Sequence, residues 1–448
     1  MHSSTSDFRR LTVVIDTSLT QGNTIQPESR FRHNVVRIAT GTIASQVIVV
    51  GATPLLTRLY RPEDFGALAV FTALHAIVAG LFTLKYELSI ILPREQDKAV
   101  DLTVLTVSIS LLLSLVLLAS LCVGHFGFGI PSHGYYLLLP LSAVLAAAYT
   151  SAQQWGARTN DYRCFARGQV VNALANVGAS LLLAVIADRL FGGLVAGFVV
   201  GLAAGLVYLW LGFLKARDSK HPPVVRTTSL AKAAKEYRHF PLFVLPSSFV
   251  ATLGLSAQPF LLQALFSLRE VGHYAIAYRF LLLPGALVGG AVAEAFRPEF
   301  VGRLNNGLET SSLFRRTLRK LALFALPVFG AFFLVAPSLF AFVLGDTYRT
   351  SGDLSRYLSI GVLAQFISQP FGYVFVATGH VRLGLLVQTA VTTLPLIGLV
   401  LGGLSGDMER ALLLSSLLTF TGSALMVALA YRCCKRSDLA AAGATPHA

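Results

Sequence analysis

Residues 192–214 read GGLVAGFVVGLAAGLVYLWLGFL, without a single charged side chain. A helix needs about 20 mainly apolar residues to cross the hydrocarbon core of a bilayer, and this run is long enough. Glycine weakens a helix in water, but neighbouring helices make it tolerable in a membrane bundle. The run therefore predicts a transmembrane helix.

The same pattern extends over the whole chain. Its 448 residues are 54% hydrophobic and only 13% charged, with a mean hydropathy of +0.66. Soluble domains carry about 25% charged residues, so this composition excludes a set of soluble domains. Twelve segments are predicted to span the membrane: 35–56, 66–92, 100–123, 135–155, 168–187, 192–214, 242–265, 272–293, 321–344, 357–377, 383–403 and 409–431.

Basic residues predict how these helices are oriented. The net charge of +14 is not taken as a sign of nucleic acid binding, because the basic residues lie between apolar runs rather than in one patch. If the N-terminus is placed inside, most of the 36 lysines and arginines fall in inner loops, as the positive-inside rule requires. We therefore expect both termini on the cytoplasmic side and no nucleic acid partner.

The longest inner loops divide the chain. The first residues lack the apolar core of a signal peptide, and the basic loop after the sixth span contains His221-Pro222-Pro223, which suits a linker. A second inner segment, 294–320, has apolar residues at helical spacing and predicts an amphipathic helix on the membrane surface. The expected divisions are a disordered cytoplasmic tail 1–34, an N-lobe 35–214, a cytoplasmic linker 215–241, a C-lobe 242–431 and a cytoplasmic tail 432–448.

The two halves resemble each other. The stretch from Pro54 to Gly66 ends the first predicted helix and opens the second with proline, an apolar turn, an acidic residue, a hydrophobic residue and glycine. The stretch from Pro259 to Gly272 repeats this order in the second half. Six helices per half, each half starting inside, predict parallel repeats around a central cavity. The expected fold is therefore all-α, with about twelve transmembrane helices in two six-helix lobes.

Enzymatic motifs do not occur. The sequence contains no GxSxG, HExxH, GxxxxGK[ST] or GxGxxG motif in a suitable setting. The four cysteines form no CxxC pair and have no histidine cluster beside them, so a zinc site is not expected. We predict no catalytic residue, metal or cofactor; the cysteines are Cys122, Cys164, Cys433 and Cys434.

Charged residues within predicted spans are the candidate site residues. An ionisable side chain at bilayer depth is costly and usually faces a cavity or a partner. Lys85 lies in the second helix and Arg279 in the eighth, while Arg37 and Arg58 lie near the two ends of the first. Cations around one cavity suit an anionic substrate, especially a phosphate. The alternative is that these side chains snorkel to the lipid headgroups.

Three further residues are candidates in the same helices. Glu87 could bind a coupling ion, H⁺ or Na⁺, or it could serve only as a structural ion pair. It is two residues from Lys85, and on a regular helix such residues point to different faces and need not pair. Tyr86 and Tyr278 are deeper than the tyrosines of the membrane interfaces and could line a sugar path.

At these residues the chain resembles the bacterial flippases of polysaccharide repeat units, including those of O-antigen and exopolysaccharide synthesis. They belong to the multidrug/oligosaccharidyl-lipid/polysaccharide (MOP) exporter superfamily. The resemblance covers nearly the whole chain, with mild departures at Tyr348 and Ser351. The matching strings are LTRLYRPEDFG at 56–66, YELSIILP at 86–93, WGAR at 155–158, FP at 240–241 and VGHYAIAYRF at 271–280.

This resemblance implies transport rather than catalysis. The implied substrate is an undecaprenyl-diphosphate-linked oligosaccharide, moved from the cytoplasmic to the periplasmic leaflet of the bacterial inner membrane. It implies alternating access coupled to an ion gradient, and polysaccharide polymerase and chain-length machinery as partners. It also places Lys85, Glu87 and Arg279 in a cationic cavity, with Arg37 and Arg58 as further candidates.

Two alternatives stay open. One is a multidrug or other exporter of the same superfamily, which an acidic and aromatic cavity would favour. The other is a membrane polysaccharide polymerase or glycosyltransferase. A polymerase is expected to carry a large outer loop, and a nucleotide-sugar transferase a soluble domain with metal-binding carboxylates. The sequence predicts neither feature.

Overall fold

The computed structural model is a helical bundle and describes residues 28–443 except 125–133, 160, 187–191 and 217–226. Within these residues, eleven helices are long and apolar enough to cross a membrane. A pair of helices bent by 45°, Phe240–Gly254 and Ser256–Leu265, makes a twelfth span if the pair is counted as one. The predicted all-α membrane fold is therefore confirmed. The predicted tail 1–34 lies mostly outside the described residues.

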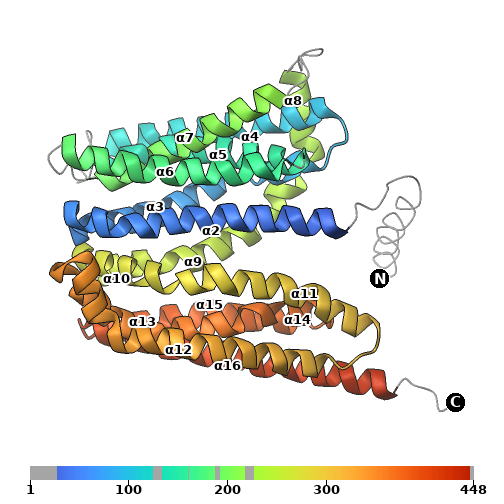
Figure 1. The fold of residues 1–448 in the computed structure, drawn as a ribbon. Helices are drawn as coiled ribbons and strands as arrows, with labels where there is room; N and C mark the ends of the chain where they lie inside the picture. Colours follow the sequence, from blue (N-terminus) through green and yellow to red (C-terminus); the bar gives the residue numbers. More distant parts are fainter. Residues whose placement is uncertain (1–27, 125–133, 160, 187–191, 217–226, 444–448) are drawn as a thin grey trace.

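The first half of the chain forms one group of helices (Figure 1). Each predicted span of this half corresponds to one long helix, because each carries about 20 apolar residues. A short helix follows in the linker. The elements are α2 (Glu28–Leu59), α3 (Pro62–Phe82), η1 (Tyr86–Ile91), α4 (Gln96–Cys122), η3 (Gly134–Leu137), α5 (Leu138–Arg158), α6 (Tyr162–Ile186), α7 (Gly193–Ala216) and α8 (Thr227–Glu236).

The second half forms the other group (Figure 1). Its last helix continues beyond the predicted end at residue 431. The elements are η4 (Phe240–Val244), α9 (Leu245–Leu265), α10 (Leu268–Leu281), η5 (Gly285–Gly289), α11 (Gly290–Asn305), α12 (Thr310–Leu344), η6 (Asp346–Tyr348), α13 (Arg349–Ser368), η7 (Gln369–Phe371), α14 (Gly372–Ala377), α15 (Val381–Gly403) and α16 (Met408–Gly443).

Two predictions of local structure were wrong. The second span was expected to continue to residue 92, but α3 ends at Phe82 because Leu84 and Lys85 adopt left-handed conformations, with φ of 49° and 62°. Such φ values are incompatible with a right-handed helix. The segment 294–320 was expected to form a separate surface helix, but it divides between α11 and α12, which are extensions of spans.

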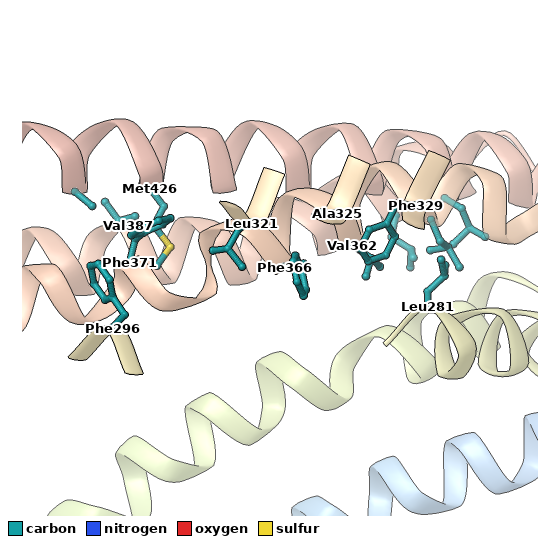
Figure 2. Close-up of a cluster of buried hydrophobic side chains, with 14 of the residues drawn as sticks. Leu281, Phe296, Leu321, Ala325, Phe329, Val362, Phe366, Phe371, Val387 and Met426 are labelled. Atoms are coloured by element: carbon teal, nitrogen blue, oxygen red, sulfur yellow. The ribbon is translucent and has the colours of Figure 1, made fainter. Parts of the chain in front are cut away.

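Large apolar side chains fill the C-lobe (Figure 2). Phe371 is fully buried and packs against Phe296 and Phe314 with ring centroids 5.5 and 4.1 Å away. Phe296 comes from the segment predicted to lie on the membrane surface, so its burial explains why α11 stays inside the bundle.

The two lobes meet closely at one end of the bundle, where α3 crosses α10. A Cβ atom on Gly66 would collide with the carbonyl oxygen of Leu268, and one on Gly272 would collide with the carbonyl oxygen of Pro62. Each obstructing residue lies four positions before the opposite glycine, so the contact has a two-fold pattern. These are the glycines that the sequence repeat aligned. We call this the crossing end.

Side chains around the glycines reinforce the contact between lobes. Tyr348 of η6 donates a hydrogen bond to the carbonyl oxygen of Tyr60, at 2.7 Å. Tyr60 in turn donates to the carbonyl oxygen of Ser180 at 2.7 Å. Arg269 and Glu63 form an ion pair at 3.8 Å. The start of α2 and the end of α16 lie at the opposite end (Figure 1), which we call the tail end.

Candidate functional site

A cavity of about 860 Å³ lies between the two lobes. The N-lobe contributes Gln46 of α2 and one face of α3 around Thr72, and the C-lobe contributes residues of α9, α10, α13, α15 and α16. Small side chains, such as Ala73 and Ala76, line the α3 wall and leave room for a large ligand. Its volume falls within the range of about 300–1,000 Å³ that is typical of ligand pockets, and residues of both lobes line it, so it is the candidate binding site.

Arg279 supplies the positive charge of this cavity. It lies eleven residues after the start of α10, about 16 Å along the helix axis from the crossing end, which is close to half the hydrocarbon thickness. Among the described residues that line the cavity, no other is charged. The described chain places no carboxylate within ion-pair distance of this guanidinium. Arg279 is therefore a partly buried cation that has space for an anionic ligand.

Five glutamines surround Arg279, and sequence reasoning missed all of them. Their amides offer both donors and acceptors without adding charge. An ionisable group within a span is costly enough to attract attention, whereas an uncharged amide gives no comparable signal in one sequence. The tendency of glutamine to recur within otherwise apolar spans could have indicated them. They are Gln46, Gln258, Gln365, Gln369 and Gln388.

Two tyrosines form the α10 wall. Tyr274 and Tyr278 are one turn apart, with ring centroids 5.5 Å apart and an interplanar angle of 13°. Tyr274 donates a hydrogen bond to Oε1 of Gln258 at 2.5 Å. This bond fixes the amide of Gln258 beside the rings. The structure thus places Tyr278, a predicted site residue, next to Arg279 in the cavity.

Lys85, Tyr86 and Glu87 lie elsewhere. They follow α3, whose 21 residues span about 30 Å, so they lie near the tail end and not among the cavity-lining residues. The break after α3 brings Nζ of Lys85 within 3.8 Å of Oε1 of Glu87, although two residues so spaced would diverge on a regular helix. Glu87 is buried, and its Oε2 has no hydrogen bond within the described chain.

The η1 segment is fixed in place by its neighbours. The Tyr86 hydroxyl donates to the carbonyl oxygen of Ala234 in α8 at 3.1 Å. Burial raises the pKa of Tyr86, so this hydroxyl stays a donor. The guanidinium of Arg158 donates to the carbonyl oxygens of Ile90, Pro93 and Arg94.

Of the two remaining predicted cations, the structure describes the side chain of Arg58 only, and it does not line the cavity. Arg58 is exposed in the last turn of α2, at the crossing end. Arg37 belongs to α2, but its side chain lies outside the described part of the structure. Of the four cations predicted together, the structure places only Arg279 among the lining residues.

A second hollow does not have the features of a substrate site. It is a groove of about 460 Å³ between α12, α13 and α16. Its walls are almost entirely apolar, with Phe420 and Val427 among them, and Arg315 at its edge is already paired with Glu309 and Tyr431. None of the predicted site residues is among the residues that line this groove.

Sequence comparison identifies the family of this chain. The profile of the polysaccharide biosynthesis protein family matches residues 55–352, which include α3, η1, α10 and Arg279. The chain belongs to this family. The match includes the α3 face of the cavity and the tyrosine-arginine wall, but not Gln46. No curated protein sequence matches the chain significantly.

Solved structures show the same fold in transporters. The lipid II flippase MurJ, in an inward closed conformation, superposes with a TM-score of 0.65 at 13% identity, and the alignment covers 91% of each chain. An inward-facing multidrug resistance transporter of the MATE family, of the MOP superfamily, gives 0.61 at 12% identity, covering 95% of this chain and 98% of that one. Its outward-facing counterpart gives 0.57 at 13% identity, with 94% and 99% covered. The chain thus has the fold of these transporters.

Proposed function

We propose that the protein is a flippase that moves an undecaprenyl-diphosphate-linked oligosaccharide from the cytoplasmic to the periplasmic leaflet of the bacterial inner membrane. Membership of the polysaccharide biosynthesis family supports the class of cargo. The observation that carries the proposal is Arg279, a cation without a carboxylate partner that lines an otherwise uncharged cavity between two lobes.

The chemistry of Arg279 suits a diphosphate. A diphosphate cannot enter hydrocarbon without a group that replaces its hydration. Guanidinium presents a planar fork of donors that matches phosphate oxygens in a bidentate manner. A site near the middle of the membrane holds the charged group at the depth where the bilayer resists it most.

The neutral groups around Arg279 suit the sugars. Glutamine amides donate to and accept from hydroxyl groups, and tyrosine rings offer an apolar face with a polar edge. The polyprenyl tail would remain in the bilayer, because hydrocarbon is already its preferred surroundings. The cavity would therefore carry only the polar part of the cargo.

In this proposal the lobes rock about the central cavity. The tail end, where the basic loops gather, would be cytoplasmic, and the crossing end would be periplasmic. Contact between the lobes at Gly66 and Gly272 closes the crossing end, which corresponds to an inward-facing state. Separation of these helices would release the cargo to the outer leaflet.

Coupling and partners are further parts of the proposal. The carboxylate of Glu87, buried near the tail end beside Lys85, is the candidate for binding H⁺ or Na⁺. Glu87 lies far from Arg279, so coupling would act through movement of η1. The polymerase and chain-length machinery would receive the cargo on the periplasmic side.

The lining of the cavity supports this function over the main alternative. A multidrug exporter for cationic compounds needs acidic groups where the drug binds, and the lining residues include arginine but no carboxylate. A polymerase or glycosyltransferase is less well supported, since the similar solved folds belong to transporters.

Deletion of the gene tests the cargo. We expect undecaprenyl-diphosphate repeat units to accumulate on the cytoplasmic leaflet, where an added membrane-impermeant glycosidase in inside-out vesicles can reach them. Surface glycan should be lost. Normal glycan in a deletion strain that has no second flippase would refute the proposal.

Substitution of Arg279 tests the site. Arg279→Gln removes the charge but keeps a polar group of similar length, and we expect at least a 10-fold loss of flipping, because charge-assisted hydrogen bonds contribute about 1.5–3 kcal/mol. Arg279→Lys should retain part of the activity. The control is Arg316→Gln, which removes one exposed positive charge from α12. Equal activity of both Gln variants, at equal protein levels in the membrane, would exclude Arg279 from substrate binding.

A further inference from the structure

A side chamber of about 110 Å³ opens from the central cavity into the C-lobe. Gln258, Gln365, Gln388 and the Tyr274–Tyr278 pair line both spaces, so the two are continuous. Its inner walls come from α9, α13, α15 and α16, and none of its lining residues belongs to the N-lobe.

Two serines give this chamber its chemical character. Ser415 and Ser416 of α16 are only 5% and 3% exposed as residues. Their hydroxyls line the chamber and have no hydrogen-bond partner within the described chain. Neither hydroxyl is used within the described chain, so a ligand bearing hydroxyl groups can pair with both. Ser423, on the same helix, is also unpartnered but lies outside the chamber.

The lining selects against charged ligands. Among the described residues that form the chamber there is neither a carboxylate nor a cation. Metal ions such as Ca²⁺ and Mg²⁺ prefer carboxylate oxygens, and an anion would lack a counter-charge. Apolar walls at Leu358, Leu399 and Leu412 alternate with the hydroxyls and amides. Such a mixture fits a ring that carries hydroxyl groups on apolar carbons.

We propose that this chamber binds one uncharged sugar of the cargo while Arg279 binds its diphosphate. The inference rests on the proposed function and specifies which part of the cargo the C-lobe recognises. Tyr278 lines both spaces and precedes Arg279 in α10, so a sugar in the chamber lies within reach of a phosphate at Arg279. A site that pairs with substrate hydroxyls rejects analogues that lack them.

Two lipids distinguish the chamber from the phosphate site. One is the lipid-linked oligosaccharide extracted from the deletion strain, and the other is undecaprenyl diphosphate without sugar. Affinity is measured on the full chain in nanodiscs. We expect the wild type to bind the glycosylated lipid about 10-fold more tightly, the equivalent of about 1.4 kcal/mol.

The double variant Ser415→Ala, Ser416→Ala should lose most of this 10-fold preference and keep its affinity for undecaprenyl diphosphate. Ser423→Ala, which removes an unpartnered hydroxyl from the same helix, should retain the preference and controls for folding of α16. Arg279→Gln should weaken binding of both lipids.

The outcomes separate the two proposals. If the double variant keeps the 10-fold preference, the proposed sugar site in the chamber is wrong, and the proposed flippase function is unaffected. Equal binding of both lipids by the wild type would also refute the sugar site without affecting the flippase proposal. If the wild type binds neither lipid, the proposed flippase function is wrong, and the proposed sugar site, which rests on it, is wrong as well.

Discussion

At the scale of single residues, Arg158 has a structural task that its position in a basic loop does not reveal. Its guanidinium donates hydrogen bonds to several backbone carbonyls at the end of η1 and in the following turn. It also lies over the Trp155 ring, with the guanidinium carbon 5.7 Å from the ring centroid. One side chain therefore satisfies carbonyls that no helix pairs.

Arg158→Lys should lower the stability of the protein. The planar guanidinium group of arginine presents several N–H donors to these carbonyls at once, and the single ammonium group of lysine cannot bond to all of them. We expect a loss of about 1–3 kcal/mol, seen as a lower thermal midpoint of the detergent-purified protein. Arg163→Lys, at an exposed position on α6, is the matched control. An unchanged midpoint for Arg158→Lys would show that water replaces these bonds at little cost.

Residues also show where sequence reasoning succeeds and where it does not. Arg279 was predictable, because a charge at bilayer depth is costly enough to require a reason. The glutamines that line the same cavity were not predictable, since an uncharged amide within the membrane does not have the high free-energy cost that makes a charged residue noticeable. The left-handed conformations of Leu84 and Lys85 could not be predicted from the sequence. They depend on the packing of η1 against α4 and α5 and not on the types of these two residues.

At the scale of elements, the crossing of α3 and α10 depends on two glycines. Gly66→Ala should force these helices apart, since the added Cβ would meet the carbonyl oxygen of Leu268 and backbone cannot move aside as a side chain does. We expect a smaller fraction of molecules closed at the crossing end. Oxidative cross-linking of Glu63→Cys with Arg269→Cys, at the positions of the ion pair, reports that fraction.

The control for this element is Gly51→Ala on α2, where a Cβ meets no neighbouring atom. It should leave the cross-linking yield unchanged. A Gly66→Ala variant that cross-links as efficiently as the wild type would mean that the helices tolerate the extra atom. The sequence aligned these glycines through the repeat, but only the structure shows that they face each other.

At the scale of the whole molecule, alternating access requires the lobes to separate at the crossing end. A disulfide between Glu63→Cys and Arg269→Cys should therefore stop flipping, and reduction should restore it. The measurement is transfer of lipid-linked oligosaccharide in proteoliposomes before and after a reducing agent. Introducing the same cysteines without oxidation should cost little, because an exposed ion pair contributes about 0–1 kcal/mol.

A second disulfide tests whether movement between lobes is what matters. Lys98→Cys with Glu236→Cys joins α4 of the N-lobe to α8 of the linker, which packs against it, at positions where Nζ of Lys98 and Oε1 of Glu236 are 4.0 Å apart. This disulfide should leave flipping unaffected if the lobe moves as a body. Inhibition by both disulfides would point instead to movement of α8 relative to α4.

The whole architecture was the part most accessible from sequence. Spans depend on apolar length, which is an additive property that one sequence contains. The orientation inferred from the charge bias stays a prediction. The central cavity also followed from the repeat. Its small number of charges did not, because which helix faces turn inward depends on packing between lobes.

The glycine contact at the crossing end also bears on the energy supply of the cell. A large cavity with a partly buried arginine holds water, so any gap above it would connect that water to the far side and let protons run down their gradient. At the two glycines, backbone atoms in direct contact leave no side chain that can swing away. The contact therefore blocks leakage of ions through the closed end of the cavity. A variant that loosens it should raise the ion permeability of the membrane before it stops transport.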